Sequence, residues 1–84
     1  MTITWLDELG PAIREVRERR RMTQEDLGSA SSCTAQHIYR IEAGRTRLSL
    51  ECLETIARVL SLQVSRLLKL AEQRAQNRKK EETQ

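Results

Sequence analysis

Aromatic residues are almost missing from this chain of 84 residues, which has one tryptophan (Trp5), one tyrosine (Tyr39) and no phenylalanine. A core must therefore be built from leucine, isoleucine and valine, and helices suit such a core. Proline occurs only once, and no segment alternates apolar and polar residues as a half-buried strand does. The sequence predicts one small all-α domain.

Other absences narrow the class of protein. No apolar run approaches membrane-spanning length, and no secretory leader is visible, so we expect no membrane partner. The two cysteines, Cys33 and Cys52, are most simply free thiols in a reducing, cytoplasmic compartment. A net charge of +3 is compatible with a nucleic-acid partner but does not establish one.

Residues 23–44 have the punctuation of two short helices joined by a tight turn. Thr23 and Asp26 form a capping-box pattern, which predicts a helix from Gln24 to about Ala30. The serines that follow favour a break, because their side chains compete for backbone hydrogen bonds. Thr34 is a good cap for a second helix, and Gly44 is a good terminator. This segment is predicted to be a helix-turn-helix.

The second of these helices has two different faces. Ile38 and Ile41 define an inward face, while Gln36 and Arg40 fall nearly opposite, with Tyr39 on the flank. Gln can form two hydrogen bonds with adenine, and Arg can form two with guanine. The face alone is also what an ordinary solvated helix surface would show, so both interpretations stay open at this point.

Four segments in order resemble the Cro/CI-type (XRE-like) helix-turn-helix repressors: Ile13–Arg17, Thr23–Leu27, Ile38–Gly44 and Ser49–Leu60. The resemblance covers roughly residues 9–68. It implies a compact five-helix fold of the lambda-repressor-like DNA-binding type, and a homodimer that binds an inverted-repeat operator through the major groove. Small members include plasmid and phage repressors and controllers of restriction-modification operons. Where the family usually has glycine, this chain carries Arg21, Ser32 and Ser61.

The resemblance also implies roles for individual residues. We expect the outward face of the second helix to read bases, and a surrounding set of polar residues to bind phosphates. The expected base-reading residues are Ala35, Gln36, Tyr39 and Arg40, and the expected phosphate-binding residues are Gln24, Thr34, His37, Arg45 and Arg47. Arg17 and Glu42 are expected to form a structural ion pair that orients the recognition helix.

Two further helices are predicted after residue 48. Ser49 caps the fourth, in which apolar residues keep the helical period, namely Leu50, Leu53, Ile56, Ala57 and Leu60. The fifth begins near Val64. Apolar residues that do not all fit the inward face predict a dimer interface, or else scattered exposed aliphatics: Val59, Leu62, Val64 and Leu70. We divide the chain into a DNA-binding domain, residues 1–70, and a polar helical extension or tail, residues 71–84.

No pattern of catalytic or metal-binding residues is recognisable. Cys33 and His37 lie four residues apart and Cys52 is distant, and a zinc site would need a fourth ligand and paired spacing. Cys33 is expected to be an inert core thiol, and we expect no metal, cofactor, small-molecule ligand or enzyme activity. The predicted function is a homodimeric repressor on double-stranded DNA. The rival is an antitoxin-like module whose main partner is another protein.

Overall fold

The computed structural model describes residues 4–82. In this range the chain forms five helices and no strand, which confirms the predicted all-α, five-helix class. The helices are α1 (Trp5–Arg19), α2 (Gln24–Ala30), α3 (Ala35–Glu42), α4 (Leu50–Val59) and α5 (Val64–Glu82). None of these helices combines the length and apolar character that a membrane-spanning segment needs.

Hydroxyl side chains begin α2, α3 and α4, as predicted. The Thr23 hydroxyl accepts from the Asp26 N–H at 2.9 Å, and the Asp26 carboxylate accepts from the Thr23 N–H at 2.9 Å, completing the capping box. The hydrogen bond from the Thr23 N–H, with a further contribution from the Thr23 hydroxyl, holds the pKa of the Asp26 carboxylate below its usual value. Thr34 and Ser49 accept from the third backbone N–H of α3 and of α4, at 3.1 and 3.0 Å.

The first four helices all end in the same way. In α3 the Gly44 N–H donates to the carbonyl of Ile41 at 3.1 Å, and the Arg45 N–H donates to that of Arg40 at 2.9 Å. This pair of bonds is the Schellman motif, and Gly44 has the positive φ of 72° that the motif requires. The corresponding residues of α1, α2 and α4 also have positive φ although they are not glycine, namely Arg21 (57°), Ser32 (57°) and Ser61 (59°).

Helix α1 continues through Gly10-Pro11 without a break. Gly10 is needed for close packing, because a Cβ at this position would lie 2.2 Å from the carbonyl oxygen of Ile41. The last turn of α3 therefore touches the backbone of α1 directly.

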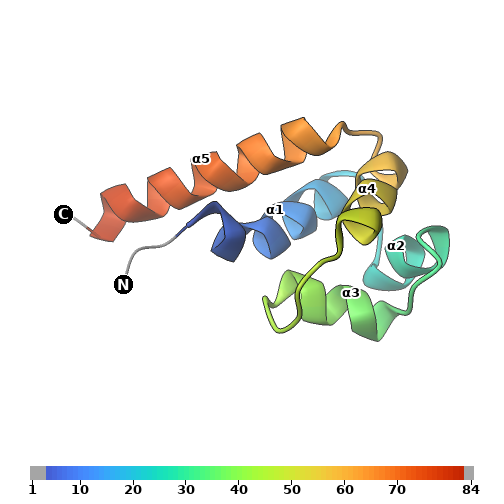
Figure 1. Ribbon diagram of the computed structural model, residues 1–84. Helices are drawn as coiled ribbons and strands as arrows, with labels where there is room; N and C mark the ends of the chain where they lie inside the picture. The colour runs from blue at the N-terminus through green and yellow to red at the C-terminus, as the bar shows by residue number, and fades with distance from the viewer. Residues whose placement is uncertain (1–3, 83–84) are drawn as a thin grey trace.

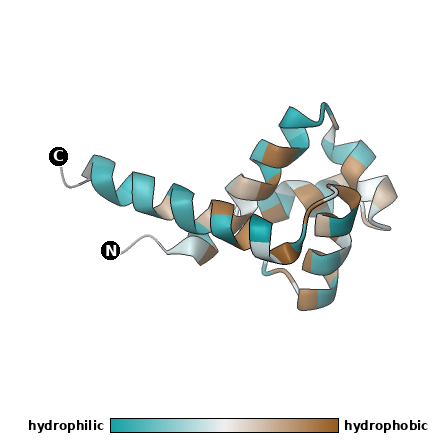
Figure 2. Cartoon of the chain, turned by 90° about the horizontal axis from the view of Figure 1, so that it is seen from above, coloured by the Kyte–Doolittle hydropathy of each residue, from teal (hydrophilic) through white to brown (hydrophobic). Residues whose placement is uncertain are grey.

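The helices form a two-part arrangement (Figure 1). Helices α1 and α5 lie side by side in opposite directions, and the start of α1 and the end of α5 share one end of the molecule. Helices α2, α3 and α4 gather at the other end of α1. Between them lies an aliphatic core: Leu9, Ala12, Ile13, Val16, Leu27, Ile38, Ile41, Leu53, Ile56, Ala57, Leu60, Leu67 and Ala71. The last turns of α5, polar in sequence, extend beyond this core (Figure 2).

One residue of the expected core is outside it. Leu50 was grouped with the inward-facing residues of α4, but its side chain is 83% exposed. It is the first residue of the helix, and helical side chains lean toward the N-terminal turn. Because no turn of α4 precedes Leu50, its side chain has no helical surface to cover.

Ion pairs attach α5 to α1. Glu8 is only 2% exposed, and its Oε1 accepts from Nε of Arg74 at 3.0 Å. Nη1 of Arg74 donates to Glu15 at 2.5 Å, and Arg78 lies 3.5 Å from Glu8. Arg74 and Arg78 lie beyond residue 70, the boundary that we predicted from the sequence between the domain and its extension. The helix passes through that boundary without interruption.

Candidate nucleic-acid interface

The candidate recognition surface is the outward face of α3. Ile38 and Ile41 are 0% and 2% exposed and pack into the core, which fixes the rotation of the helix about its axis. Gln36, Tyr39 and Arg40 are exposed as a result. Gln36 and Arg40 are four residues apart, so they lie one above the other on the same face. This face presents an amide, a guanidinium and a phenol to solvent, and Ala35 beside them is half-buried.

A buried ion pair holds α3 against α1. Nε of Arg17 donates to Oε2 of Glu42 at 2.6 Å, and Nη2 donates to Oε1 at 3.0 Å. The third donor, Nη1, bonds to the carbonyl of Met22 at 2.7 Å. Both side chains are almost fully buried, and the hydrogen bonds to Glu42 raise the pKa of Arg17 above its usual value. Since two parallel bonds to a carboxylate fix both position and angle, this pair orients α3.

The residues predicted to bind phosphate fall into two groups. Thr34, Arg45 and Arg47 are exposed at the two ends of α3. Gln24, half-buried at the start of α2, donates from Nε2 to Oε1 of Glu42 at 3.1 Å, so its amide supports the ion pair. His37 is half-buried on the side of α3 that faces α4. Three of the five thus surround the exposed face of α3, and two point into contacts within the protein.

Comparison with known families identifies the class of protein to which this chain belongs. The sequence pattern of the helix-turn-helix domain matches residues 8–71. The chain belongs to this helix-turn-helix family. The resemblance to XRE-like helix-turn-helix transcriptional regulators is therefore confirmed, and the matched range includes the ion pair, the turn and α3. No curated protein sequence matches the chain with significance.

Two solved structures share the fold of this helix-turn-helix protein, and both are the clp gene regulator ClgR from Corynebacterium glutamicum. The first has a TM-score of 0.94 at 24% identity, over 99% of this chain and 88% of that chain. The second has a TM-score of 0.79 at 27% identity, over 84% of this chain and 91% of that chain. Family and fold together make this helix-turn-helix protein a DNA-binding transcriptional regulator, a class without enzymatic activity.

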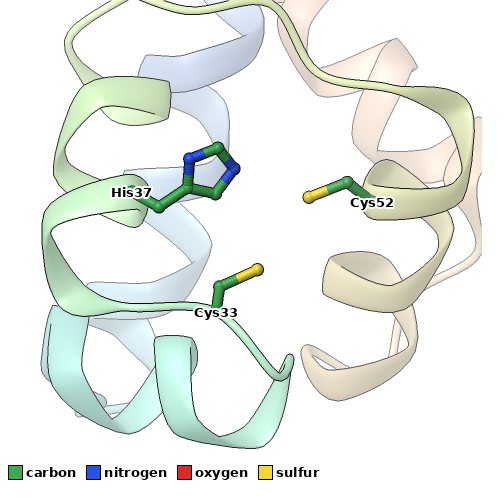
Figure 3. Close-up of side chains that lie close together, drawn as sticks. All are labelled: Cys33, His37 and Cys52. Carbon is green, nitrogen blue, oxygen red and sulfur yellow. The ribbon is translucent and has the colours of Figure 1, made fainter.

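The helix-turn-helix of this protein contains a cluster that sequence spacing did not reveal. The Sγ atoms of Cys33 and Cys52 and a ring nitrogen of His37 lie within 4.8 Å of one another (Figure 3). Cys33 comes from the turn between α2 and α3, His37 from the first turn of α3, and Cys52 from α4. Burial raises the pKa of the Cys52 thiol, and the neighbouring Cys33 thiol adds to the effect. Cys33 is half-buried, less enclosed than the core thiol that we expected.

The residues predicted for a dimer interface are less exposed than the sequence suggested. Val59, Leu62, Val64 and Leu70 are all half-buried against the core. These four residues do not lie on one inward face of α4 or α5. They are nevertheless half-buried, because the short turn between the two helices packs α4 against α5 and so covers a second side of each helix. The large apolar side chains that are exposed in the described chain lie elsewhere, namely Trp5, Leu6, Tyr39 and Leu50.

Proposed function

We propose that this protein is a sequence-specific repressor that binds an inverted-repeat operator in double-stranded DNA as a homodimer. The observation that carries the proposal is the exposed pair Gln36 and Arg40, on a helix whose opposite face is fully buried. A helix held this firmly can enter the major groove as a rigid body. Occupancy of an operator that overlaps a promoter would block polymerase, and the protein would act in the cytoplasm, where bacterial DNA lies.

Base recognition follows from the chemistry of the exposed side chains. The Gln36 amide can bond to N6 and N7 of adenine, and the Arg40 guanidinium can bond to O6 and N7 of guanine. Ala35 and Tyr39 flank them and supply apolar contact, which suits a thymine methyl group. A site read in this way contains at least one adenine and one guanine in each half-site.

Phosphate contacts would surround this face. Arg45 and Arg47 follow α3 on an exposed loop, and the Thr34 hydroxyl precedes α3. Gln24 keeps a second amide N–H beyond the one bonded to Glu42, and this can reach a phosphate. We leave His37 out of the phosphate set, because its ring lies beside two thiols (Figure 3). Contacts of this kind position the protein but carry no sequence information.

The homodimer would form at the turn between α4 and α5. Val59, Leu62, Val64 and Leu70 each leave part of an aliphatic side chain at the surface there. To bind half-sites one helical turn of DNA apart, the two copies of α3 would have to lie about 34–36 Å from each other. The DNA-binding unit would be residues 1–70, with residues 71–84 as its extension. Sedimentation tests this interface with Leu62→Glu, and Leu50→Glu, outside the interface, is the control. If both variants remained dimeric, the interface would be excluded.

The test of base reading starts from an operator selected out of random DNA by the purified protein. Gln36→Ala and Arg40→Ala should each weaken binding to that operator by about 1–3 kcal/mol, or about 5- to 150-fold. Affinity for unrelated DNA should change less. The matched control is Arg14→Ala, which removes an exposed arginine on the α1 surface near Arg74, away from α3.

Two outcomes would contradict the assignment. Equal affinity of the wild-type protein for the selected operator and for unrelated DNA would exclude a sequence-specific repressor. An unchanged affinity in both alanine variants, with helicity preserved by circular dichroism, would remove Gln36 and Arg40 from the site. In the second case the protein would still bind DNA, but through another face.

A further inference from the structure

Three side chains with metal-binding atoms converge between the recognition helix and α4. Figure 3 shows the thiols of Cys33 and Cys52 pointing toward each other and toward the ring of His37. Their ligand atoms all lie within 4.8 Å of one another, and each residue is half-buried. Among the residues that the structure describes, these three form the group of cysteine, histidine or carboxylate residues whose ligand atoms lie close enough together to hold one metal ion. Nothing in the proposed DNA contacts uses this cluster.

The donor set suits one kind of ion. Two thiolates and one imidazole are the ligands that Zn²⁺ prefers, whereas Mg²⁺ and Ca²⁺ take oxygen. With Zn–S near 2.3 Å and Zn–N near 2.1 Å, tetrahedral ligand atoms are roughly 3.6–3.8 Å apart. The present separations exceed this by about 1 Å at most, which small rotations of three side chains can close. Sites with three protein ligands keep their fourth position open to water or to an added ligand.

The origin of the three residues explains why their spacing was not recognisable. Cys33 and His37 are separated by one helical turn across the start of α3, and the Thr34 cap fixes that turn. Cys52 stands at the third position of α4, where its N–H is bonded to the hydroxyl of Ser49 at 3.0 Å. Cap geometry at two helix starts therefore aims the side chains into one space. These two local structures fix the backbone around the three residues before any ion enters, and their side chains keep the freedom to rotate.

We propose that Cys33, His37 and Cys52 bind one Zn²⁺ ion per chain and thereby tie the start of the recognition helix to α4. Binding releases two thiol protons to solvent, so two thiolates balance the charge of the ion. The weak hydrogen bond from Sγ of Cys33 to the carbonyl of Ser31, 3.5 Å long, is lost when that proton leaves. The proposal concerns the free protein and does not depend on DNA binding.

Co²⁺ is the spectroscopic probe for this site. The full chain, stripped with a chelator and kept reduced by a phosphine, is titrated with Co²⁺ and then with Zn²⁺. The expected result is a thiolate-to-cobalt band in the near ultraviolet that saturates at one ion per chain, with tetrahedral bands in the visible. Zn²⁺ should displace the cobalt. Cys33→Ser, His37→Gln and Cys52→Ser should each weaken metal binding at least about tenfold. Replacing even a residue that only hydrogen-bonds to a metal ligand usually lowers metal affinity by that factor.

A second measurement keeps the test independent of variant folding. In the wild-type protein, Zn²⁺ should slow alkylation of both thiols by iodoacetamide, followed by mass spectrometry of Cys33 and Cys52. Serine variants of residues outside the cluster, such as Thr55→Ser, should bind Co²⁺ like the wild type. Absence of the near-ultraviolet band would overturn the proposal, as would binding that His37→Gln leaves unchanged. Formation of a Cys33–Cys52 disulfide on oxidation, without metal binding by the reduced protein, would also overturn it and identify a redox pair.

Discussion

Within residues 4–82, four residues end helices in the left-handed conformation, and one of these four is glycine. Arg21, Ser32 and Ser61 adopt φ values of 57–59° that cost a residue with a Cβ roughly 1–2 kcal/mol. The turns keep the shape that glycine favours, although the chain lacks glycine at these three positions. Each turn still makes both Schellman hydrogen bonds.

Ser32→Gly should therefore stabilise the protein. We expect the free energy of unfolding in urea to rise by about 1 kcal/mol, because glycine occupies positive φ without strain. The matched control is Ser29→Gly, an exposed serine inside α2, which should lower it by about 0.5–1 kcal/mol. A loss of stability in Ser32→Gly equal to that in Ser29→Gly would show that backbone strain at Ser32 is negligible.

Gly10 is constrained by packing, since its φ is that of an ordinary helix. Gly10→Ala should lower the free energy of unfolding by about 1–3 kcal/mol, although alanine is the better helix former. The added Cβ would overlap the carbonyl oxygen of Ile41 and force α1 and α3 apart. Gly44→Ala serves as comparison, because it meets no atom within 4 Å and should cost only the strain of its φ, about 1 kcal/mol. A Gly10→Ala variant more stable than the wild type would contradict this packing.

At the scale of the elements, a buried ion pair connects α1 to α3. Arg17→Met should lower the free energy of unfolding by about 3–5 kcal/mol, because Glu42 would keep a buried charge without its partner. The double variant Arg17→Met with Glu42→Leu should recover most of that loss. Chemical denaturation of the three proteins measures both effects.

The exposed pair of Arg58 and Glu54 provides the control for this prediction. Their atoms approach to 2.7 Å, but both side chains face solvent, so Arg58→Ala should change stability by at most about 0.5 kcal/mol. Similar losses for Arg17→Met and Arg58→Ala would mean that burial does not set the strength of the first pair. A double variant no more stable than Arg17→Met would point to lost packing instead.

Helix starts and ends were largely predictable because they depend on neighbouring residues. Thr23, Thr34 and Ser49 mark three starts by their hydroxyl groups, and Gly44 marks one end by its freedom at positive φ. The exposure of Leu50 was not predictable from the helical spacing of apolar residues. Leu50 fits that spacing, but it lies in the first turn, and no earlier turn of α4 is there for its side chain to cover. The end of α2 was predicted from the side-chain chemistry of Ser31 and Ser32, whereas the absence of an expected glycine at Arg21, Ser32 and Ser61 was visible only through the family resemblance.

At the scale of the whole molecule, the contact of Arg17 with Glu42 was expected from the family resemblance, but other contacts between distant segments could not be predicted from the sequence. Nothing local connects Glu8 with Arg74, or Cys52 with His37, because core packing of other residues brings each pair together. The outward face of α3 was predictable, since Ile38 and Ile41 define its buried side. The assignment of Gln36 and Arg40 to bases stays a prediction until binding is measured.

Arg74→Gln tests how α5 is attached to α1. Removing the guanidinium deprives the buried Glu8 of a charged hydrogen bond, which should cost about 1.5–3 kcal/mol. Amide hydrogen exchange in residues 72–82 should accelerate, because this part of α5 packs mainly beside the start of α1. Arg66→Gln removes an exposed arginine from the same helix and should leave exchange there unchanged. Equal exchange in the two variants would show that Arg74 does not hold the end of α5 against α1.

The antiparallel run of α1 and α5 leaves the first and last described turns as close neighbours at one pole of the molecule (Figure 1). Such proximity is what circular permutation requires, so a short linker could join the ends and new termini could open in the loop after Gly44 or between α4 and α5. A fluorescent reporter fused at either end would likewise lie apart from the exposed face of α3. The architecture thus tolerates attachments at that pole without rebuilding the domain.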